Sequence, residues 1–136
     1  IIIAVSSAAL LAGGAASAQN VDLGQKEYMN SCAQCHGAAG QGGGYLAGFL
    51  SSELPDLTML QKNNGGVFPV AGVYGIIDGS APGAIHGAGD MPVWGNRYSV
   101  DAAGQLGVEY SREQRDAFVR GRILALVEYI STLQAE

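Results

Sequence analysis

Two thiols and an imidazole lie within five residues of one another in this sequence. Cys32 and Cys35 are separated by two residues, and His36 follows directly. This C-x-x-C-H spacing is the attachment signature of c-type haem. The thiols are spaced to add to the two vinyl groups on one edge of a porphyrin, and the adjacent imidazole can bind the iron beneath it. We therefore predict that Cys32 and Cys35 hold one covalent haem c and that His36 is an axial iron ligand.

The same residues are compatible with three other kinds of site. A thioredoxin-like redox pair expects a βαβ setting, which the sequence does not indicate. A structural zinc ion normally has four ligands, and because the chain contains two Cys and two His, the fourth would have to be His86. That spacing resembles no zinc finger. A disulfide bond between Cys32 and Cys35 remains a third alternative for a chain that lacks haem.

A haem iron bound by His36 needs a second axial ligand. The candidates are the three methionines and His86. A thioether is a soft, neutral ligand that favours reduced iron. Met91, in Gly89-Asp90-Met91-Pro92, is far enough along the chain to reach the opposite face of the ring, and it is the expected sixth ligand. Met29, one turn before the cysteines, and Met59 are expected to pack as apolar side chains. His86 competes for the ligand position but is expected to be a solvated loop residue.

The length and composition indicate one globular domain. Of 136 residues, 48% are hydrophobic and 14% are charged, which is typical of a folded chain rather than a disordered one. The net charge of −5 leaves no basic surface for nucleic acid. We expect redox proteins as donors and acceptors, with basic docking faces and association that slows as salt rises.

Residues 1–18 have the pattern of a secretory signal peptide whose charged start is missing. An apolar run to Leu11 is followed by small residues that end in Ala16-Ser17-Ala18, an A-x-A cleavage pattern. Because the apolar run is shorter than the roughly 20 residues that span a bilayer, we expect cleavage rather than an anchor. The prediction is an exported, periplasmic bacterial protein whose domain covers residues 19–136, with no membrane span after cleavage.

Hydrophobic periodicity predicts three helices and no strands. Asp22 is the expected N-cap of the first helix, which runs to Cys32 with Lys26 and Glu27 on its solvent side. A second helix is expected over residues 67–77 and ends at Asp78-Gly79.

The last helix has the clearest pattern. It is expected to begin after Ser111 as N-cap, with Glu113 and Gln114 in its first turn. Its apolar positions form one face, which must be buried: Val119, Ile123, Leu126, Val127, Ile130 and Leu133. Before it, residues 54–58 are expected to be extended and then to turn into a short helix, because Pro55 disfavours helix in the residue before it.

The C-x-x-C-H motif, Pro55-Asp56-Leu57-Thr58, Met91-Pro92 and a terminal helix with Tyr129 follow one another in this order. Together they resemble a class I cytochrome c over residues 23–133. The resemblance implies an all-α cytochrome c fold of three to five helices with long loops wrapped round one covalent haem. It implies that the first and last helices cross at Gly24, where Tyr28 and Tyr129 approach. It also implies that the Pro55 carbonyl accepts a hydrogen bond from His36, which fixes the imidazole.

Residues 95–110 are the one departure from the smallest members of that family. We interpret them as a long connection to the last helix, beginning just after Trp94, whose ring is expected to pack either on the haem or in the core.

An iron with both axial positions filled by His36 and Met91 does not readily bind oxygen or peroxide, so we expect an electron carrier rather than an enzyme. It would shuttle single electrons between membrane or periplasmic oxidoreductases. A haem subunit of a larger dehydrogenase or oxidase complex, and a haem enzyme or sensor with an open sixth site, stay open as alternatives.

Overall fold

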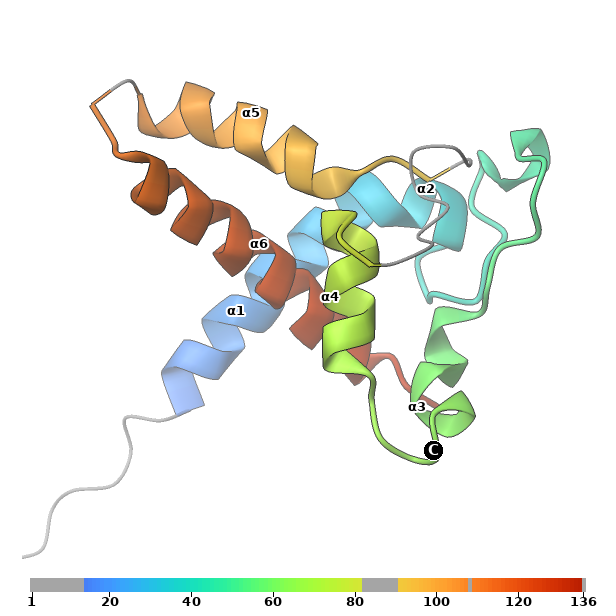
Figure 1. Cartoon of the computed structure of the whole chain (residues 1–136). Coiled ribbons are helices and arrows are strands. Elements are labelled where there is room, and N and C mark those ends of the chain that lie inside the picture. The colour runs from blue at the N-terminus through green and yellow to red at the C-terminus, as the bar shows by residue number, and fades with distance from the viewer. Residues whose placement is uncertain (1–13, 82–90, 108, 136) are drawn as a thin grey trace, which may run out of the picture.

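The structure, a computed structural model, describes residues 14–81, 91–107 and 109–135. All regular structure in these ranges is helical, which confirms the all-α prediction (Figure 1). The elements follow in the order α1 (Gly14–Glu27), the π-helical turn η1 (Tyr28–Cys32), α2 (Ala33–His36), η2 (Ala47–Phe49), η3 (Leu57–Met59), α3 (Leu60–Asn63), α4 (Val70–Asp78), α5 (Trp94–Leu106) and α6 (Arg112–Thr132).

The first helix begins earlier than the sequence analysis predicts. Asp22 lies inside α1 and is exposed, so its prediction as N-cap is wrong. The alanine-rich residues before it favour helix and extend α1 back to Gly14. Residues 14–18 of the expected signal peptide thus belong to α1, and residues 1–13 lie outside the described part of the chain. At its other end the helical path continues through η1 into α2 and carries the C-x-x-C-H motif, as expected.

The last helix begins where the sequence predicts. The Ser111 side chain accepts a hydrogen bond from the Gln114 backbone N–H at 3.3 Å, and the Gln114 side chain accepts one from the Ser111 N–H at 2.8 Å. This reciprocal pair is a capping box, which satisfies two N–H groups that the helix itself leaves unpaired. The predicted apolar face is buried at Val119, Ile123, Leu126, Val127 and Ile130, and Leu133, just after the helix, is half-buried.

Ser111→Ala is expected to lower the free energy of unfolding of the haem-loaded protein by about 1 kcal/mol, because it removes the oxygen that caps the first turn. Urea denaturation measures this change. Ser131→Ala is the control in the same helix, because the Ser131 hydroxyl only donates back to the Glu128 carbonyl at 2.6 Å, a bond that contributes little to helix stability. Equal losses in the two variants would argue against the cap.

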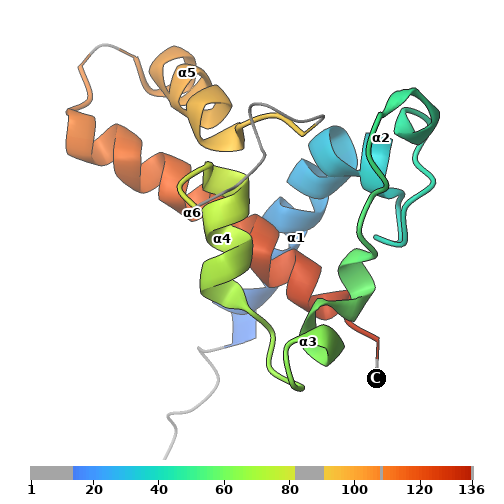
Figure 2. The same cartoon turned by 45° about the vertical axis from the view of Figure 1, so that its right-hand side comes forward.

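Helices α1 and α6 cross (Figures 1 and 2), and a glycine permits their close approach. A Cβ atom on Gly24 would lie 2.0 Å from the Ala125 carbonyl oxygen and 2.8 Å from the Tyr129 Cβ. Beside this contact the rings of Tyr28 and Tyr129 lie 5.3 Å apart at 51°. The structure therefore confirms the helix crossing that the family resemblance implied.

Helix α4 is the predicted second helix, but it begins at Val70 rather than at residue 67. Its N-cap is Pro69, whose backbone is not helical, so residues 67–69 stay outside the helix. Gly79 ends α4 in the left-handed conformation at φ +85°, as the Asp78-Gly79 pair indicated.

The largest difference concerns residues 95–110, which the sequence analysis interprets as a long connection to the last helix. Most of them form helix α5, whose C-terminal end lies close to the start of α6, so that the two helices diverge toward the start of α5 (Figure 1). Besides Gly95, its buried residues are Trp94, Tyr98 and Ala102, which recur every four residues and so form a single stripe. The prediction is wrong because a stripe of one residue per turn, on a helix that also contains Gly95 and Gly104, is a weak signal in the sequence.

Candidate haem site

An apolar cavity of about 270 Å³ lies beside the C-x-x-C-H turn. Cys32, His36 and Met91 are all on its wall. The rest of the lining is mostly apolar: Ser52, Glu53, Leu54, Pro55, Leu57, Leu60, Val73, Ile76, Ile77 and Ile130. The fold thus brings the thiol and imidazole of the C-x-x-C-H turn and a thioether from a distant segment to the wall of one mostly apolar cavity.

The other candidate residues lie elsewhere. Cys35 is half-buried on α2, next to His36, and is not among the residues that line the cavity. Met59 is half-buried and also does not line it. Met29 is 45% exposed, so the expectation that it packs in the core is wrong: the buried side of η1 is taken by Tyr28 and Cys32, and Met29 lies on the other side. His86 falls in the stretch 82–90, outside the described residues.

The glycine-rich loop after the motif folds back onto it. Three backbone hydrogen bonds join the loop to α2: from Gly42 to His36 at 2.8 Å, from Gly44 to Cys35 at 3.1 Å and from Leu46 to Gln34 at 2.9 Å. From the opposite side, the fully buried Tyr28 donates its hydroxyl to the Gly37 carbonyl at 2.8 Å. The turn that carries the imidazole is therefore held from both sides.

The segment around Pro55 has the predicted shape. Asp56 is extended and its carboxylate accepts hydrogen bonds from the Thr58 N–H at 2.8 Å and hydroxyl at 2.7 Å, which starts the short helices η3 and α3. Pro55 and His36 share the wall of the same cavity. This placement agrees with the hydrogen bond expected between them, which stays a prediction.

Helix α4 supplies a wall of the cavity that the sequence analysis did not assign to the site. Val73, Ile76 and Ile77 line it from positions i, i+3 and i+4 of one helix face. The spacing is visible in the sequence, but it does not say which surface the face covers. Trp94 instead packs in the core against Tyr98, with ring centroids 6.3 Å apart, and does not line the cavity. The sequence analysis expects the Trp94 ring either on the haem or in the core, and the structure places it in the core.

Burial raises the pKa of the Cys32 thiol to about 12, and the charges of Glu27 and Cys35 add to the effect. Zinc binding and disulfide exchange both need a thiolate, which redox C-x-x-C motifs obtain by lowering the thiol pKa. The pKa of Cys32 is thus shifted in the direction opposite to that of a redox C-x-x-C thiol. Within the ranges that the structure describes, no group of three or more His, Cys, Asp and Glu side chains is placed to hold a metal ion.

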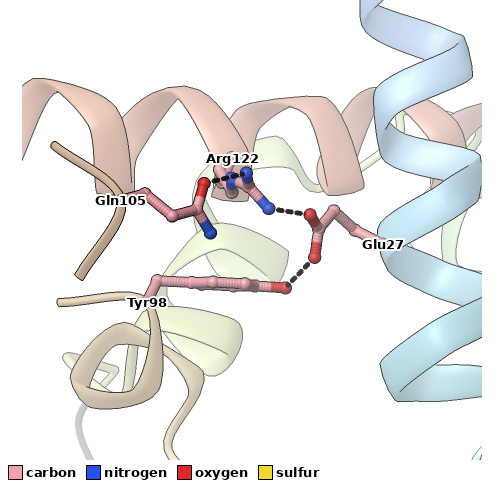
Figure 3. Close-up of polar contacts among 4 residues, drawn as sticks. All are labelled: Glu27, Tyr98, Gln105 and Arg122. Carbon is pink, nitrogen blue, oxygen red and sulfur yellow. Dashed lines mark hydrogen bonds and ion pairs between the residues drawn. The ribbon is translucent and has the colours of Figure 1, made fainter. Parts of the chain in front are cut away.

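Glu27 forms the centre of a polar cluster where α1, α5 and α6 meet (Figure 3). It pairs with Arg122, and the buried Tyr98 donates its hydroxyl to the Glu27 carboxylate at 3.3 Å. Arg122 also donates to the Gln105 side-chain oxygen at 3.1 Å. The Glu27 side chain is only 12% exposed, so its predicted place on the solvent side is wrong. Helix α5, which the sequence analysis missed, contributes two of the residues that surround it.

Burial, and then the charge of Glu27, raise the pKa of the Tyr98 phenol. Tyr98 therefore keeps its proton and remains the donor to Glu27 across the neutral pH range. Because Glu27 is the last residue of α1, directly before the π-helical turn that carries Cys32, the cluster ties this end of α1 to α5 and α6 (Figure 3).

An all-helical domain that places a C-x-x-C-H turn and a distant thioether on one apolar cavity has the fold and the donor set of a c-type haem protein. The family model Cytochrome c matches residues 21–134, and the chain belongs to this family, whose members bind haem c and carry electrons. Neither the curated proteins nor the solved structures give a significant match. No helix among residues 14–81, 91–107 and 109–135 combines the length and apolar character that crossing a membrane requires.

Proposed function

We propose that this chain is a single-haem cytochrome that carries one electron at a time between periplasmic or membrane oxidoreductases. The observation that supports it is the apolar cavity shared by Cys32, His36 and Met91. In this proposal Cys32 and Cys35 hold the haem covalently, and His36 and Met91 are the axial ligands. The bound haem supplies an iron centre that accepts and releases a single electron.

The residues of the chain set the conditions for that transfer. With haem in the cavity, the apolar wall and the neutral thioether of Met91 would both favour the reduced state and raise the reduction potential. His36 is 6% exposed, on a turn whose carbonyls are tied to the following loop. His36 and Met91 together leave no iron position free for oxygen or peroxide, which suits electron transfer rather than catalysis.

The export and the partners are part of the same proposal. The A-x-A pattern at residues 16–18 supports cleavage after Ala18 and a periplasmic location. The net charge of −5 supports donors and acceptors with basic docking faces, because opposite charge accelerates the encounter of two proteins.

Absorption spectra of the oxidised and reduced protein, with a pyridine haemochrome test, check this function. We expect one covalent haem per chain and a long-wavelength sulfur-to-iron band that vanishes in Met91→Ala, because the thioether is lost, and persists in His86→Ala. A wild type without this band, whose spectrum changes in His86→Ala and not in Met91→Ala, would assign the sixth position to His86. A colourless protein, produced with intact export and haem-attachment machinery, would end the proposal. Rapid carbon monoxide binding by the reduced wild type at neutral pH would favour an enzyme or sensor instead.

A further inference from the structure

The end of α4 and the start of α5 are in close contact at two glycines, Gly79 and Gly95. A Cβ atom on Gly95 would lie 2.6 Å from the Asp78 carbonyl oxygen and 2.8 Å from its carboxylate. A Cβ atom on Gly79 would lie 2.5 Å from the Val93 side chain. These separations are shorter than real Cβ contacts, so both places require glycine. We call the four residues Asp78, Gly79, Val93 and Gly95 the α4–α5 clamp.

Each half of the clamp also has a backbone role. Gly79 ends α4 at φ +85°, a conformation that side chains disfavour, and its N–H donates to the Gly75 carbonyl at 2.9 Å. The N–H of Ala81 donates to the same carbonyl at 3.0 Å. Gly95 lies in the first turn of α5, whose N-cap lacks a side-chain hydrogen bond. The Asp78 carboxylate beside this turn places negative charge where a helix dipole is stabilised by it.

The clamp holds the chain on both sides of the stretch that leads to Met91. The chain leaves the end of α4 at Ala81, which is hydrogen-bonded to Gly75, and returns to it at Val93, two residues after Met91. Met91 is half-buried on the cavity wall, next to residues from the same helix α4. Met91 thus lies two residues before Val93, which contributes to the contact between α4 and α5.

We propose that the α4–α5 clamp positions Met91 as the sixth iron ligand, and that Gly79 and Gly95 are positioning residues for this bond. The inference rests on the proposed function. If Val93 and Gly95 move away from α4, Met91 moves with them, and the thioether spends more time away from the iron. An external ligand that binds only the released state then gains apparent affinity in proportion to the population of that state.

Imidazole binding to the oxidised haem-loaded protein tests the proposal, together with the long-wavelength sulfur-to-iron band. In Gly95→Ala we expect imidazole affinity to rise about tenfold or more, because thioether release becomes that much more frequent, and the band to weaken or vanish. Gly104→Ala is the matched control in the same helix, since a Cβ atom there meets nothing within 4 Å. Its band and imidazole affinity should equal those of the wild type.

Val93→Ala decides the question if Gly95→Ala does not retain haem. It removes the methyl groups that contact Gly79 without adding a clash, and we expect a several-fold rise in imidazole affinity with unchanged far-UV circular dichroism. Wild-type affinity and an intact band in a folded clamp variant would overturn the proposal. If Met91→Ala loses the band while the clamp variants behave like the wild type, Met91 is the ligand and only the proposed role of the clamp is contradicted. If Met91→Ala keeps the band, Met91 is not the ligand, and the proposed role of the clamp is contradicted as well.

Discussion

The double variant Cys32→Ala, Cys35→Ala is expected to lose cooperative folding, because a chain that cannot attach haem must close or hydrate an apolar cavity of about 270 Å³. Burial of apolar surface contributes about 25 cal/mol per Å², and the haem would supply much of that surface on the inner side of the fold. Far-UV circular dichroism should show reduced helix content and a broad thermal transition in place of a sharp one.

The elements around the cavity explain why the loss should be so large. Helices η2, η3, α2 and α3 have only three or four residues each, and helices this short are not stable alone. Three of them contribute residues to the cavity wall: α2 with His36, η3 with Leu57 and α3 with Leu60. Helices α1, α5 and α6 pack mainly on one another, so the remaining helicity is expected to come from them (Figure 2).

Wild-type chain produced without haem-attachment machinery is the control for this variant. It keeps both thiols, and it should be as poorly ordered as the double variant, because the missing haem and not the missing sulfur is responsible. Native-like cooperative melting of the double variant without haem would contradict the interpretation. A well-ordered haem-free wild type beside a disordered variant would assign the effect to the cysteines themselves.

The parts of the fold that could be predicted have local signatures. The C-x-x-C-H spacing places three functional groups on one helical turn, and the Ser111–Gln114 capping box marks the start of α6. The start of α1 had a competing signal, since Asp22 is a good N-cap residue inside an alanine-rich helix. Local preference cannot decide between a cap and a helix that continues through it.

The parts that could not be predicted depend on residues far apart in the sequence. Glu27 is mostly shielded from solvent because Arg122 and Tyr98 reach it from α6 and α5, and no pattern near Glu27 contains that information. Helix α5 also depends on distant residues, because its narrow apolar stripe is buried only by packing against α6. Met91 lies on the same cavity wall as His36, and its role as iron ligand stays a prediction. The glycine contacts near this segment appear only in three dimensions.

Gly24→Ala is expected to destabilise the haem-loaded protein by about 3 kcal/mol, at the upper end of the cost of overpacking. The added Cβ would lie 2.0 Å from the Ala125 carbonyl oxygen, a backbone atom that cannot rotate away, so α1 and α6 must separate. Separation also weakens the contact between the Tyr28 and Tyr129 rings, and an aromatic pair contributes about 0.5–1.5 kcal/mol of its own. Denaturant titration followed by circular dichroism measures the loss.

A Gly→Ala substitution at an exposed position of α6 should raise the free energy of unfolding instead of lowering it. This opposite effect makes the test specific to the helix crossing. Gly121 is exposed in the middle of α6, and a Cβ atom there meets nothing within 4 Å. Gly121→Ala should therefore stabilise the protein by about 0.5–1 kcal/mol through helix propensity alone. A Gly24→Ala protein as stable as the wild type would contradict the close crossing of α1 and α6. If both variants lost stability equally, the cause would lie in glycine replacement in general rather than in the contact with Ala125.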